Sequence, residues 1–153
     1  MNCQTVLVSI EIQKPSEQVW EVIADFNNMH TWAPSIEKTE SISPVKRGVG
    51  AVRRNTATGF GAIDQTVTEW TEGEGFTYHV APFGPFASTL TSYRLQALSE
   101  TTSECTIKLS YSLRETGSEG PTASQLQAKL TAGLHEILGA LKTRVETGNR
   151  IRE

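Results

Sequence analysis

Apolar residues recur at spacings of three and four along the last long segment of the chain, Pro121 to Thr147. This spacing places them on one face of an α-helix. Pro121 suits a first helical turn, and Gly148 suits the position just after the last turn. At 1.5 Å per residue this helix would be roughly 40 Å long, so its apolar face requires a large partner surface. The predicted face consists of Leu126, Leu130, Leu134, Ile137, Leu138, Leu141 and Val145.

The part of the chain before this segment shows the two-residue alternation of β-strands. In residues 5–13 the apolar side chains stand mainly at even positions, so we predict that these positions face the core. Residues 103–115 alternate in the same way, with apolar side chains at odd positions. One buried and one exposed face are typical of an antiparallel sheet that is covered on one side. Turn residues bound further predicted strands at 36–43, 49–57, 62–71, 75–81 and 87–98.

Two short helices are predicted between the first and second strands. Pro15 and Glu17 favour a helix start, and Phe26 lies at the end of the apolar face that follows. A second helix within residues 25–34 should end near Ala33, because a residue before proline disfavours the helical region. The order of elements predicts an α+β fold, with a curved seven-stranded antiparallel sheet wrapped around the C-terminal helix. Such a sheet seldom closes tightly on a helix, so we expect a cavity between them.

Composition excludes some classes of function. The chain has 153 residues, of which 37% are hydrophobic and 20% charged, and a formal net charge of −3. Acidic and basic residues are interspersed, so we expect no nucleic-acid partner, and no apolar run is long enough to span a membrane. The first residues lack the features of a signal peptide, so we expect a cytoplasmic location. A homodimer is one possible oligomeric state.

No metal or cofactor is expected from the sequence. Cys3 and Cys105 are far apart along the chain and are predicted to be free thiols. Neither a metal-ligand spacing, a glycine-rich phosphate loop nor a Ser-His-Asp order is present. The absence of such motifs argues against several classes of enzyme.

Several stretches, together with the terminal helix, carry a resemblance to a known group of proteins: residues 8–12 with Pro15, residues 19–26, residues 32–34 and residues 48–54. They resemble the helix-grip (SRPBCC) superfamily, which includes START lipid-transfer domains, the major birch-pollen allergen and bacterial polyketide cyclase/dehydrase-like proteins. The chain is most similar to the small cyclase-like members. The resemblance implies one helix-grip domain over residues 1–153, with a hydrophobic ligand cavity between sheet and helix that is entered past mobile loops.

Arg53 is the most distinctive candidate in the predicted cavity. Val49 and Ala51 share its parity, and the resemblance places a motif arginine at this position, so we predict that Arg53 points inward. The alternative is a position near a strand end, where its side chain reaches solvent. A buried guanidinium needs a partner, which could be a ligand carboxylate, phenolate or enolate, or Gln65, Glu69 or a backbone carbonyl. In an enzyme it could stabilise an enolate.

The tyrosines and histidines offer further polar groups. Tyr78, Tyr93 and Tyr111 are predicted to face inward, either toward a ligand or as core residues bonded to the backbone. Parity places His79 on the outer face, opposite Tyr78. His30 belongs either to the rim of the pocket or to the structure around the short helices. His135 is predicted at the flank of the long helix.

Residues 81–87, with two prolines and two phenylalanines, form the most unusual stretch. They could act as a lid over the cavity, resembling the gate loops of plant hormone-binding members of the superfamily. They could equally form a wide hairpin whose phenylalanines close the end of the core. Trp32 also has two possible roles: it could form part of the cavity wall or belong to the core.

The predicted ligand-binding set combines these candidates with the inward-facing rows of the strands and the long helix. It comprises Phe26, Trp32, Arg53, Asn55, Ile63, Gln65, Val67, Tyr78, Val80, Phe83, Phe86, Thr89, Thr91, Tyr93, Leu109, Tyr111, Leu126, Leu130 and Leu134. The candidates for a catalytic role are Arg53, Tyr78, Tyr93 and His30.

Three functions remain open. The protein could bind or carry a small hydrophobic molecule such as a lipid or polyketide, since such pockets are mostly apolar with a few placed polar groups. It could be a polyketide cyclase or dehydratase that uses cavity arginine and tyrosine. It could also be a protein-interaction module. Because His30 is the sole plausible base, binding stands ahead of catalysis.

Overall fold

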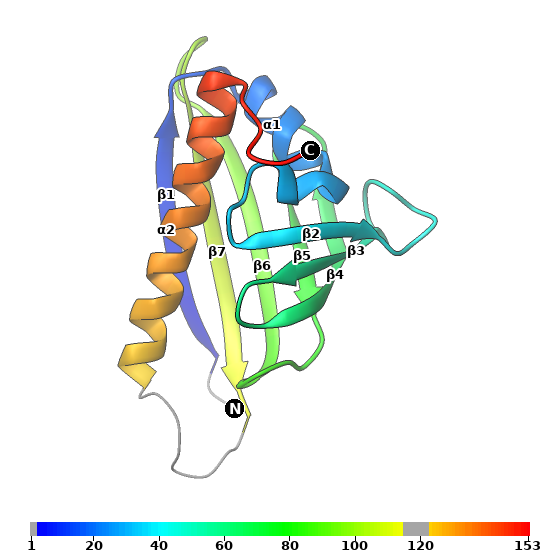
Figure 1. Cartoon of the computed structure of the whole chain (residues 1–153). Helices are drawn as coiled ribbons and strands as arrows, with labels where there is room; N and C mark the ends of the chain where they lie inside the picture. The colour runs from blue at the N-terminus through cyan, green and yellow to red at the C-terminus, as the bar shows by residue number, and fades with distance from the viewer. Residues whose placement is uncertain (1–2, 115–122) are drawn as a thin grey trace.

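The computed structural model describes residues 3–114 and 123–153. Seven strands form one antiparallel sheet in the order β1-β7-β6-β5-β4-β3-β2 (Figure 1). The strands are β1 (Gln4–Ile12), β2 (Ile36–Ser41), β3 (Val52–Ala57), β4 (Gly61–Thr71), β5 (Gly75–Val80), β6 (Phe86–Ala97) and β7 (Ser103–Leu113). The helices are α1 (Ser16–Ala24), the 3-10 helix η1 (Phe26–Thr31) and α2 (Ala123–Thr147). The predicted α+β fold is confirmed, with two short helices after the first strand.

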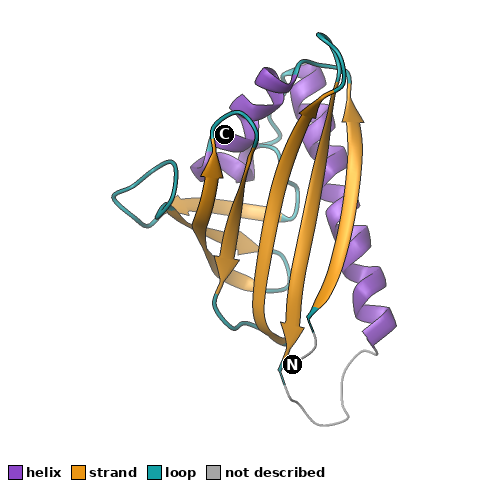
Figure 2. Ribbon diagram, turned by 180° about the vertical axis from the view of Figure 1, so that it is seen from behind, coloured by secondary structure: helices purple, strands orange, loops and turns teal. Residues whose placement is uncertain are grey.

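The helices all lie on one side of the sheet. In the view from behind, the strands lie in front of α1 and α2 (Figure 2). Burial therefore alternates along the edge strand β1, where Val6, Val8 and Ile12 are buried whereas Leu7 is 61% exposed. The inner face and α2 therefore enclose the core.

The start of β3 differs from the prediction. Residues 49–51 do not belong to β3, because Gly48 and Gly50 adopt φ values of 91° and 92° and turn the chain. Val49 is consequently 63% exposed and does not face inward as predicted, although Ala51 is buried. At the other end of the chain, the predicted helix start at Pro121 lies outside the described residues.

A bulge in β4 explains why its apolar residues have opposite parity. The pairing of β4 with β5 shifts between Val67 and Glu69. Val67 is buried before the shift, and Trp70 after it stacks on Phe76 with ring centroids 5.4 Å apart. Both side chains can thus pack toward the interior although they are an odd number of residues apart.

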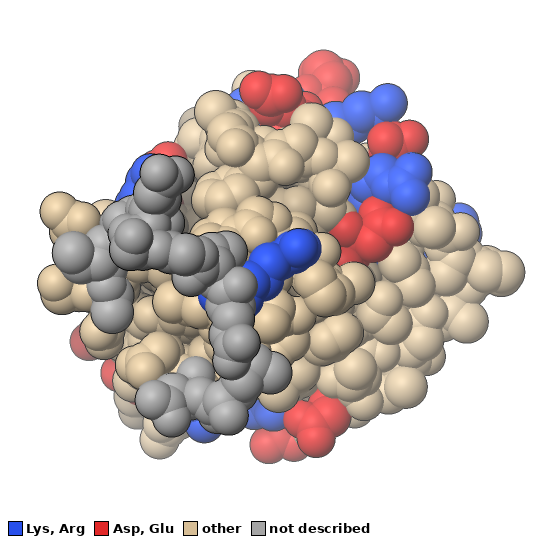
Figure 3. All heavy atoms as spheres, turned by 90° about the horizontal axis from the view of Figure 1, so that it is seen from below, with Lys and Arg blue, Asp and Glu red and all other residues tan. Residues whose placement is uncertain are grey.

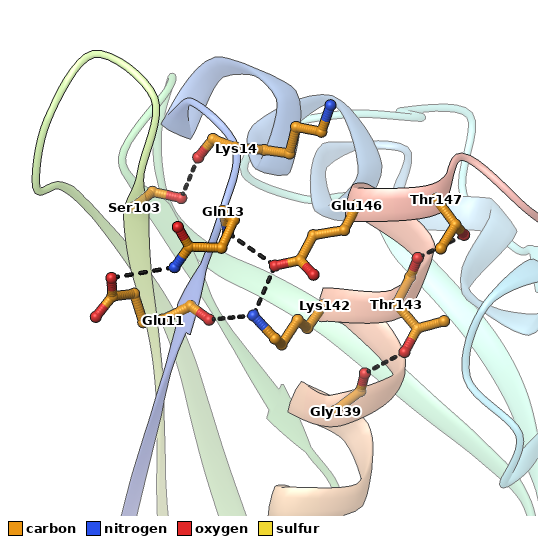
Figure 4. Close-up of polar contacts among 9 residues, drawn as sticks. All are labelled: Glu11, Gln13, Lys14, Ser103, Gly139, Lys142, Thr143, Glu146 and Thr147. Atoms are coloured by element: carbon orange, nitrogen blue, oxygen red, sulfur yellow. Dashed lines mark hydrogen bonds and ion pairs between the residues drawn. The ribbon is translucent and has the colours of Figure 1, made fainter.

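Polar contacts fix the C-terminal end of α2 to the end of β1 (Figure 4). Lys142 Nζ donates to the Glu11 carbonyl at 2.9 Å, and the Glu146 carboxylate accepts the Gln13 N–H at 2.7 Å. Lys142 and Glu146 also form an ion pair of 2.6 Å. These groups satisfy backbone atoms at an edge strand that would otherwise face solvent.

The residues after α2 are tied to the short helices by Arg152. Its guanidinium donates to the backbone carbonyls of His30, Ala33, Pro34 and Ile36 at 2.7–3.2 Å. Four acceptors around one arginine use most of its fixed N–H donors. The C-terminal end of the chain therefore links α2 to η1 and β2.

We expect Leu141→Ala to lower the free energy of unfolding by about 2–5 kcal/mol, because Leu141 is 0% exposed and its loss leaves a cavity under α2. Leu7→Ala is the matched control on the exposed face of β1 and should change stability by less than about 0.5 kcal/mol. Equilibrium unfolding in urea measures both. Equal losses in the two variants would show that the α2 face does not carry the core.

The stability contributed by Glu146 should depend on pH. The hydrogen bond from Gln13 N–H, and then the contact with Lys142, lower the pKa of the Glu146 carboxyl below its ordinary 4.5. A lowered folded-state pKa stabilises the protein above the unfolded pKa, and this contribution is lost as the pH falls through the folded value. Glu146→Gln should therefore cost about 0.5–1 kcal/mol near neutral pH, and the difference from the wild type should shrink below pH 4.5.

Urea unfolding at a series of pH values measures this difference. Glu136→Gln makes the same exchange at an exposed position of α2 and should leave stability at neutral pH nearly unchanged. A cost for Glu146→Gln that stays constant down to acidic pH would contradict the proposed role of its charge.

Candidate functional site

A cavity of about 180 Å³ lies between the sheet and the N-terminal half of α2. Most of the predicted ligand-binding residues line it, drawn from β4 to β7, the β5–β6 turn and α2. They are Ile63, Gln65, Tyr78, Val80, Phe83, Phe86, Thr89, Thr91, Tyr93, Leu109, Leu130 and Leu134. Phe60 and Ile137 line it as well and were not in the predicted set. Ile137 was recognisable from its place on the apolar face of the helix, whereas Phe60 is in a turn, where no periodicity applies.

Strand pairing places the inward-facing side chains of neighbouring strands next to one another. Tyr78 pairs with Thr91, and Val80 pairs with Thr89, so the inward side chains of β5 and β6 form adjacent rows. Gln65 on β4 pairs with Val80 and extends the same layer. Residues two positions apart on a strand share a face, which is why the sequence pattern identified these rows.

Arg53 points inward, as predicted, but it lies behind the cavity wall. Its side chain is buried, and the residue is 2% exposed. Its Nε donates to Gln65 Oε1 at 2.6 Å, and its Nη1 donates to the Phe26 carbonyl at 2.9 Å. The guanidinium carbon lies 3.9 Å from the centre of the Phe26 ring and 5.3 Å from that of Tyr78. Glu69, another partner considered from the sequence, pairs with Arg94 instead.

Burial and the neighbouring phenols set the electrostatics around Arg53. Desolvation lowers the pKa of the Arg53 guanidinium, and Tyr78 and Tyr93 oppose this change. An arginine side chain nevertheless keeps its proton in proteins, so a positive charge is buried here. Desolvation also raises the pKa of Tyr93 well above its ordinary value, with a further increase from Tyr78 and a partial offset by Arg53. Tyr93 is therefore a neutral phenol at physiological pH.

A chain of hydrogen bonds leads from the short helices to Gln65. The His30 backbone N–H donates to Thr39 Oγ1 at 3.0 Å, and Thr39 Oγ1 donates to Asn55 Oδ1 at 2.8 Å. Asn55 Nδ2 then donates to Gln65 Oε1 at 3.2 Å. Asn55 is 0% exposed, so this network fixes the polar groups at the closed end of the site.

Some predicted ligand-binding residues do not line the cavity: Phe26, Trp32, Arg53, Asn55, Val67, Tyr111 and Leu126. Phe26 instead contacts Arg53, Asn55 donates to Gln65, and Tyr111 packs edge-on against Phe86 with ring centroids 5.7 Å apart. Trp32 is buried and borders a separate cleft with Arg144 near the C-terminal end of α2. Parity identified inward residues, but it could not tell the cavity from the solid core beside it.

That second cleft has a volume of about 380 Å³ and is lined by charged as well as apolar groups. Glu21 and Asp25 border it on the side of α1, and Arg144 and Arg150 on the side of α2 and the residues that follow. It lies outside the space between the sheet and the apolar face of α2. The smaller, mostly apolar cavity is therefore the candidate functional site.

The histidines lie away from the cavity. His30 is half-buried within η1, and His79 is exposed on the outer face of β5, as its parity predicted. His135 is exposed on the flank of α2, as predicted. Among the described residues, no histidine, carboxylate, lysine or thiol lines the 180 Å³ cavity.

Residues 81–87 form a compact turn at one end of the cavity. Phe83 and Phe86 exchange both backbone hydrogen bonds, at 3.1 and 2.9 Å, and Gly84 between them has a φ of 50°. Phe86 is buried, while Phe83 packs edge-on against the exposed Phe60 with ring centroids 6.0 Å apart. Seen from below, uncharged side chains cover much of this face, a basic side chain extends across its centre, and most other charged side chains lie toward the margin (Figure 3).

Metal-binding side chains do not cluster in the described part of the chain. In residues 3–114 and 123–153, no group of three His, Cys, Asp or Glu side chains comes close enough to hold a metal ion. No helix among them is long and apolar enough to cross a membrane. Cys3 and Cys105 are both free, and burial raises the pKa of the Cys105 thiol to about 12.

Comparison with solved structures supports the fold described above. A START superfamily protein from Mycobacterium smegmatis superposes with a TM-score of 0.79 at 14% identity, covering 94% of this chain and 97% of that one. The ZhuI aromatase/cyclase from Streptomyces sp. R1128 gives 0.78 at 19% identity, with 95% and 94% covered. The protein XoxI from Bacillus cereus gives 0.76 at 20% identity, with 92% and 94% covered.

Sequence comparison identifies the family. Comparison with curated proteins gave no match. The family model described as polyketide cyclase / dehydrase and lipid transport matches residues 4–146. The chain therefore belongs to this family, within the helix-grip superfamily that its sequence resembles.

Proposed function

We propose that this protein binds a small hydrophobic molecule in the cavity between the sheet and α2. The composition of the cavity wall supports this proposal. Apolar side chains dominate, and the polar groups among the described lining residues are hydroxyls and one amide, on Gln65, Tyr78, Thr89, Thr91 and Tyr93. Ligand-binding pockets typically combine apolar walls with a few placed polar groups of this kind.

The chemistry of these groups favours binding over catalysis. A general base must be able to accept a proton near the working pH. The described lining residues offer no such group, and burial makes the Tyr93 phenol still harder to ionise by raising its pKa. The site can therefore hold and orient a molecule more readily than it can move its protons.

The volume limits the size of the ligand. An apolar cavity of roughly 150 Å³ can hold benzene, so 180 Å³ suits a body of about one ring with a short substituent. A longer molecule would extend past Phe60 and Phe83 at the end of the cavity. A compact ligand, or the end of a longer one, fits the space better than a whole lipid.

We expect wild-type protein to bind ethylbenzene, a compact apolar probe, and Thr91→Phe to weaken this binding by roughly tenfold or more. Thr91 lines the cavity, so an added ring would occupy much of its 180 Å³. Leu90→Phe is the matched control, since Leu90 is the neighbouring residue on the outer face of β6 and is 43% exposed. Protein-observed NMR titration measures the affinities.

Absence of ethylbenzene binding to the wild type would overturn the proposal and favour an interaction module. Equal weakening by Thr91→Phe and Leu90→Phe would place the probe elsewhere on the molecule. Mass spectrometry of protein purified under native conditions provides an independent readout, because a co-purified hydrophobic metabolite should be absent from Thr91→Phe.

A second candidate function is a polyketide cyclase or dehydratase. The buried positive charge of Arg53 lies 5.3 Å from the Tyr78 ring, and Tyr78 lines the cavity. A phenol backed by a guanidinium could donate a hydrogen bond to a developing enolate oxygen. The likeness to an aromatase/cyclase structure points in the same direction at the level of the fold.

Turnover of a short poly-β-keto ester separates the two functions. Under the binding proposal, wild-type protein should bind the ester without accelerating its cyclisation above the rate in buffer. An acceleration that disappears in Tyr78→Phe would instead establish the cyclase. Tyr78→Phe removes only the hydroxyl. Binding of ethylbenzene to this variant is therefore the control for an intact cavity.

Arg53→Ala should lower the free energy of unfolding by about 2–4 kcal/mol, whichever function holds. The change removes the donors to Gln65 and the Phe26 carbonyl and leaves an empty space beneath the cavity. Arg54→Ala is the matched control, because the neighbouring Arg54 makes a half-exposed ion pair with Asp64 and should matter far less. Thermal and urea unfolding measure both, and equal effects would contradict the structural role of Arg53.

A further inference from the structure

Gln65 is a cavity residue whose amide group has a direction fixed by its partners. Asparagine and glutamine amides present an acceptor oxygen on one side and two N–H donors on the other. Which side faces the ligand therefore decides what the site can recognise. The hydrogen bonds around Gln65 settle this orientation.

The first constraint comes from Arg53. A guanidinium carries donors only, so the atom of Gln65 that lies 2.6 Å from Arg53 Nε must be the amide oxygen. No other assignment of the amide avoids placing two donors against each other.

The second constraint comes through Asn55. Thr39 Oγ1 accepts the His30 backbone N–H, so its own proton is free to go to Asn55 Oδ1. Gln65 Oε1 is already fixed by Arg53 and can only accept, so the Asn55 amide turns its nitrogen toward Gln65 and its oxygen toward Thr39. The Asn55 nitrogen therefore faces Gln65 Oε1 and donates to it at 3.2 Å.

Both hydrogen bonds engage Gln65 Oε1 with Arg53 and Asn55, neither of which lines the cavity. Gln65 lines the cavity, and the hydrogen bonds it makes with the described residues use its Oε1 as acceptor, which leaves its Nε2 as the donor for a ligand. The Thr89 and Thr91 hydroxyls in the same cavity can rotate to donate or accept and so impose less selection. The cavity thus offers a prepositioned N–H donor beside apolar walls.

The charge of Arg53 acts in the same direction. No carboxylate among the described residues forms an ion pair with Arg53, so its positive charge is not neutralised locally. A positive charge behind Gln65 favours ligand atoms with negative partial charge and disfavours ligand donors. A carbonyl oxygen can accept the hydrogen bond from the Gln65 amide nitrogen, and its negative partial charge is attracted by Arg53.

We propose that the Gln65 amide nitrogen recognises a carbonyl oxygen on a compact apolar ligand, such as an aryl ketone. This inference rests on the proposed binding function and specifies its ligand class. The apolar body lies against the leucines of α2 and the aromatic side chains of the sheet. Arg53 and Asn55 act as positioning residues, since they hold the amide without lining the cavity.

The test compares acetophenone, which carries a carbonyl, with ethylbenzene, which has a similar shape and no acceptor. Gln65→Glu keeps an oxygen for Arg53 and Asn55 and replaces the N–H donor by a second acceptor. We expect the ratio of the acetophenone to the ethylbenzene dissociation constant to rise by about three- to tenfold in this variant. The two probes differ in desolvation, but this difference is the same for the wild type and the variant, so it cancels when their ratios are compared.

Gln96→Glu is the matched control, because it makes the same exchange at an exposed position on β6. It should leave the ratio unchanged. An unchanged ratio in Gln65→Glu would overturn the carbonyl inference while cavity binding of ethylbenzene still stood. Failure of wild-type protein to bind either probe would overturn the binding function itself, and the inference with it.

A second readout covers the case in which Gln65→Glu impairs binding of both probes. Infrared spectroscopy of ¹³C-carbonyl acetophenone bound to the wild type should show a carbonyl stretch at lower frequency than in an apolar solvent, because a hydrogen bond weakens the C=O bond. A frequency equal to that in the apolar solvent would contradict the inference.

Discussion

Burial of the apolar face of α2 against the curved sheet is the constraint on which the structure depends. Leu138 and Leu141 in the C-terminal half of α2 are 0% exposed, whereas Leu130, Leu134 and Ile137 line the cavity. Contacts with β1 and with the short helices anchor the C-terminal end. The helix is thus closely packed at one end and stands over a hollow nearer the other, because a straight rod cannot follow a curved sheet along its whole length.

The polar network beneath the cavity is the second organising feature. A buried guanidinium would be costly without partners, and Arg53 finds them in the Phe26 carbonyl, in Gln65 and in two aromatic rings. These partners come from η1, β4 and β5, so the network joins the short helices to the sheet. The same bonds that offset the cost of burial also orient the Gln65 amide, which lines the cavity.

The chemistry of the cavity follows from this separation of roles. The charge lies behind the wall, and neutral hydroxyls and an amide stand at its surface. Such a surface can orient an acceptor on an apolar molecule, and the family includes proteins described by cyclisation, dehydration and lipid transport. Within a common fold, the difference between carrying and converting a ligand rests on whether a group near the cavity can exchange protons.

The sequence by itself determined the order of elements and the inward rows, because helical and strand periodicities are local properties of the chain, whereas the inward direction of Arg53 was predicted from parity together with the family resemblance. It missed the exposure of Val49, where two glycines turn the chain, and the contribution of Phe60, which lies in a turn without periodicity. Only the tertiary structure decided that Trp32, Val67 and Leu126 lie outside the cavity, and that Arg53 reaches Gln65 and not the ligand space. Parity specifies a face of the sheet, whereas the position of the hollow on that face depends on how the helix crosses it.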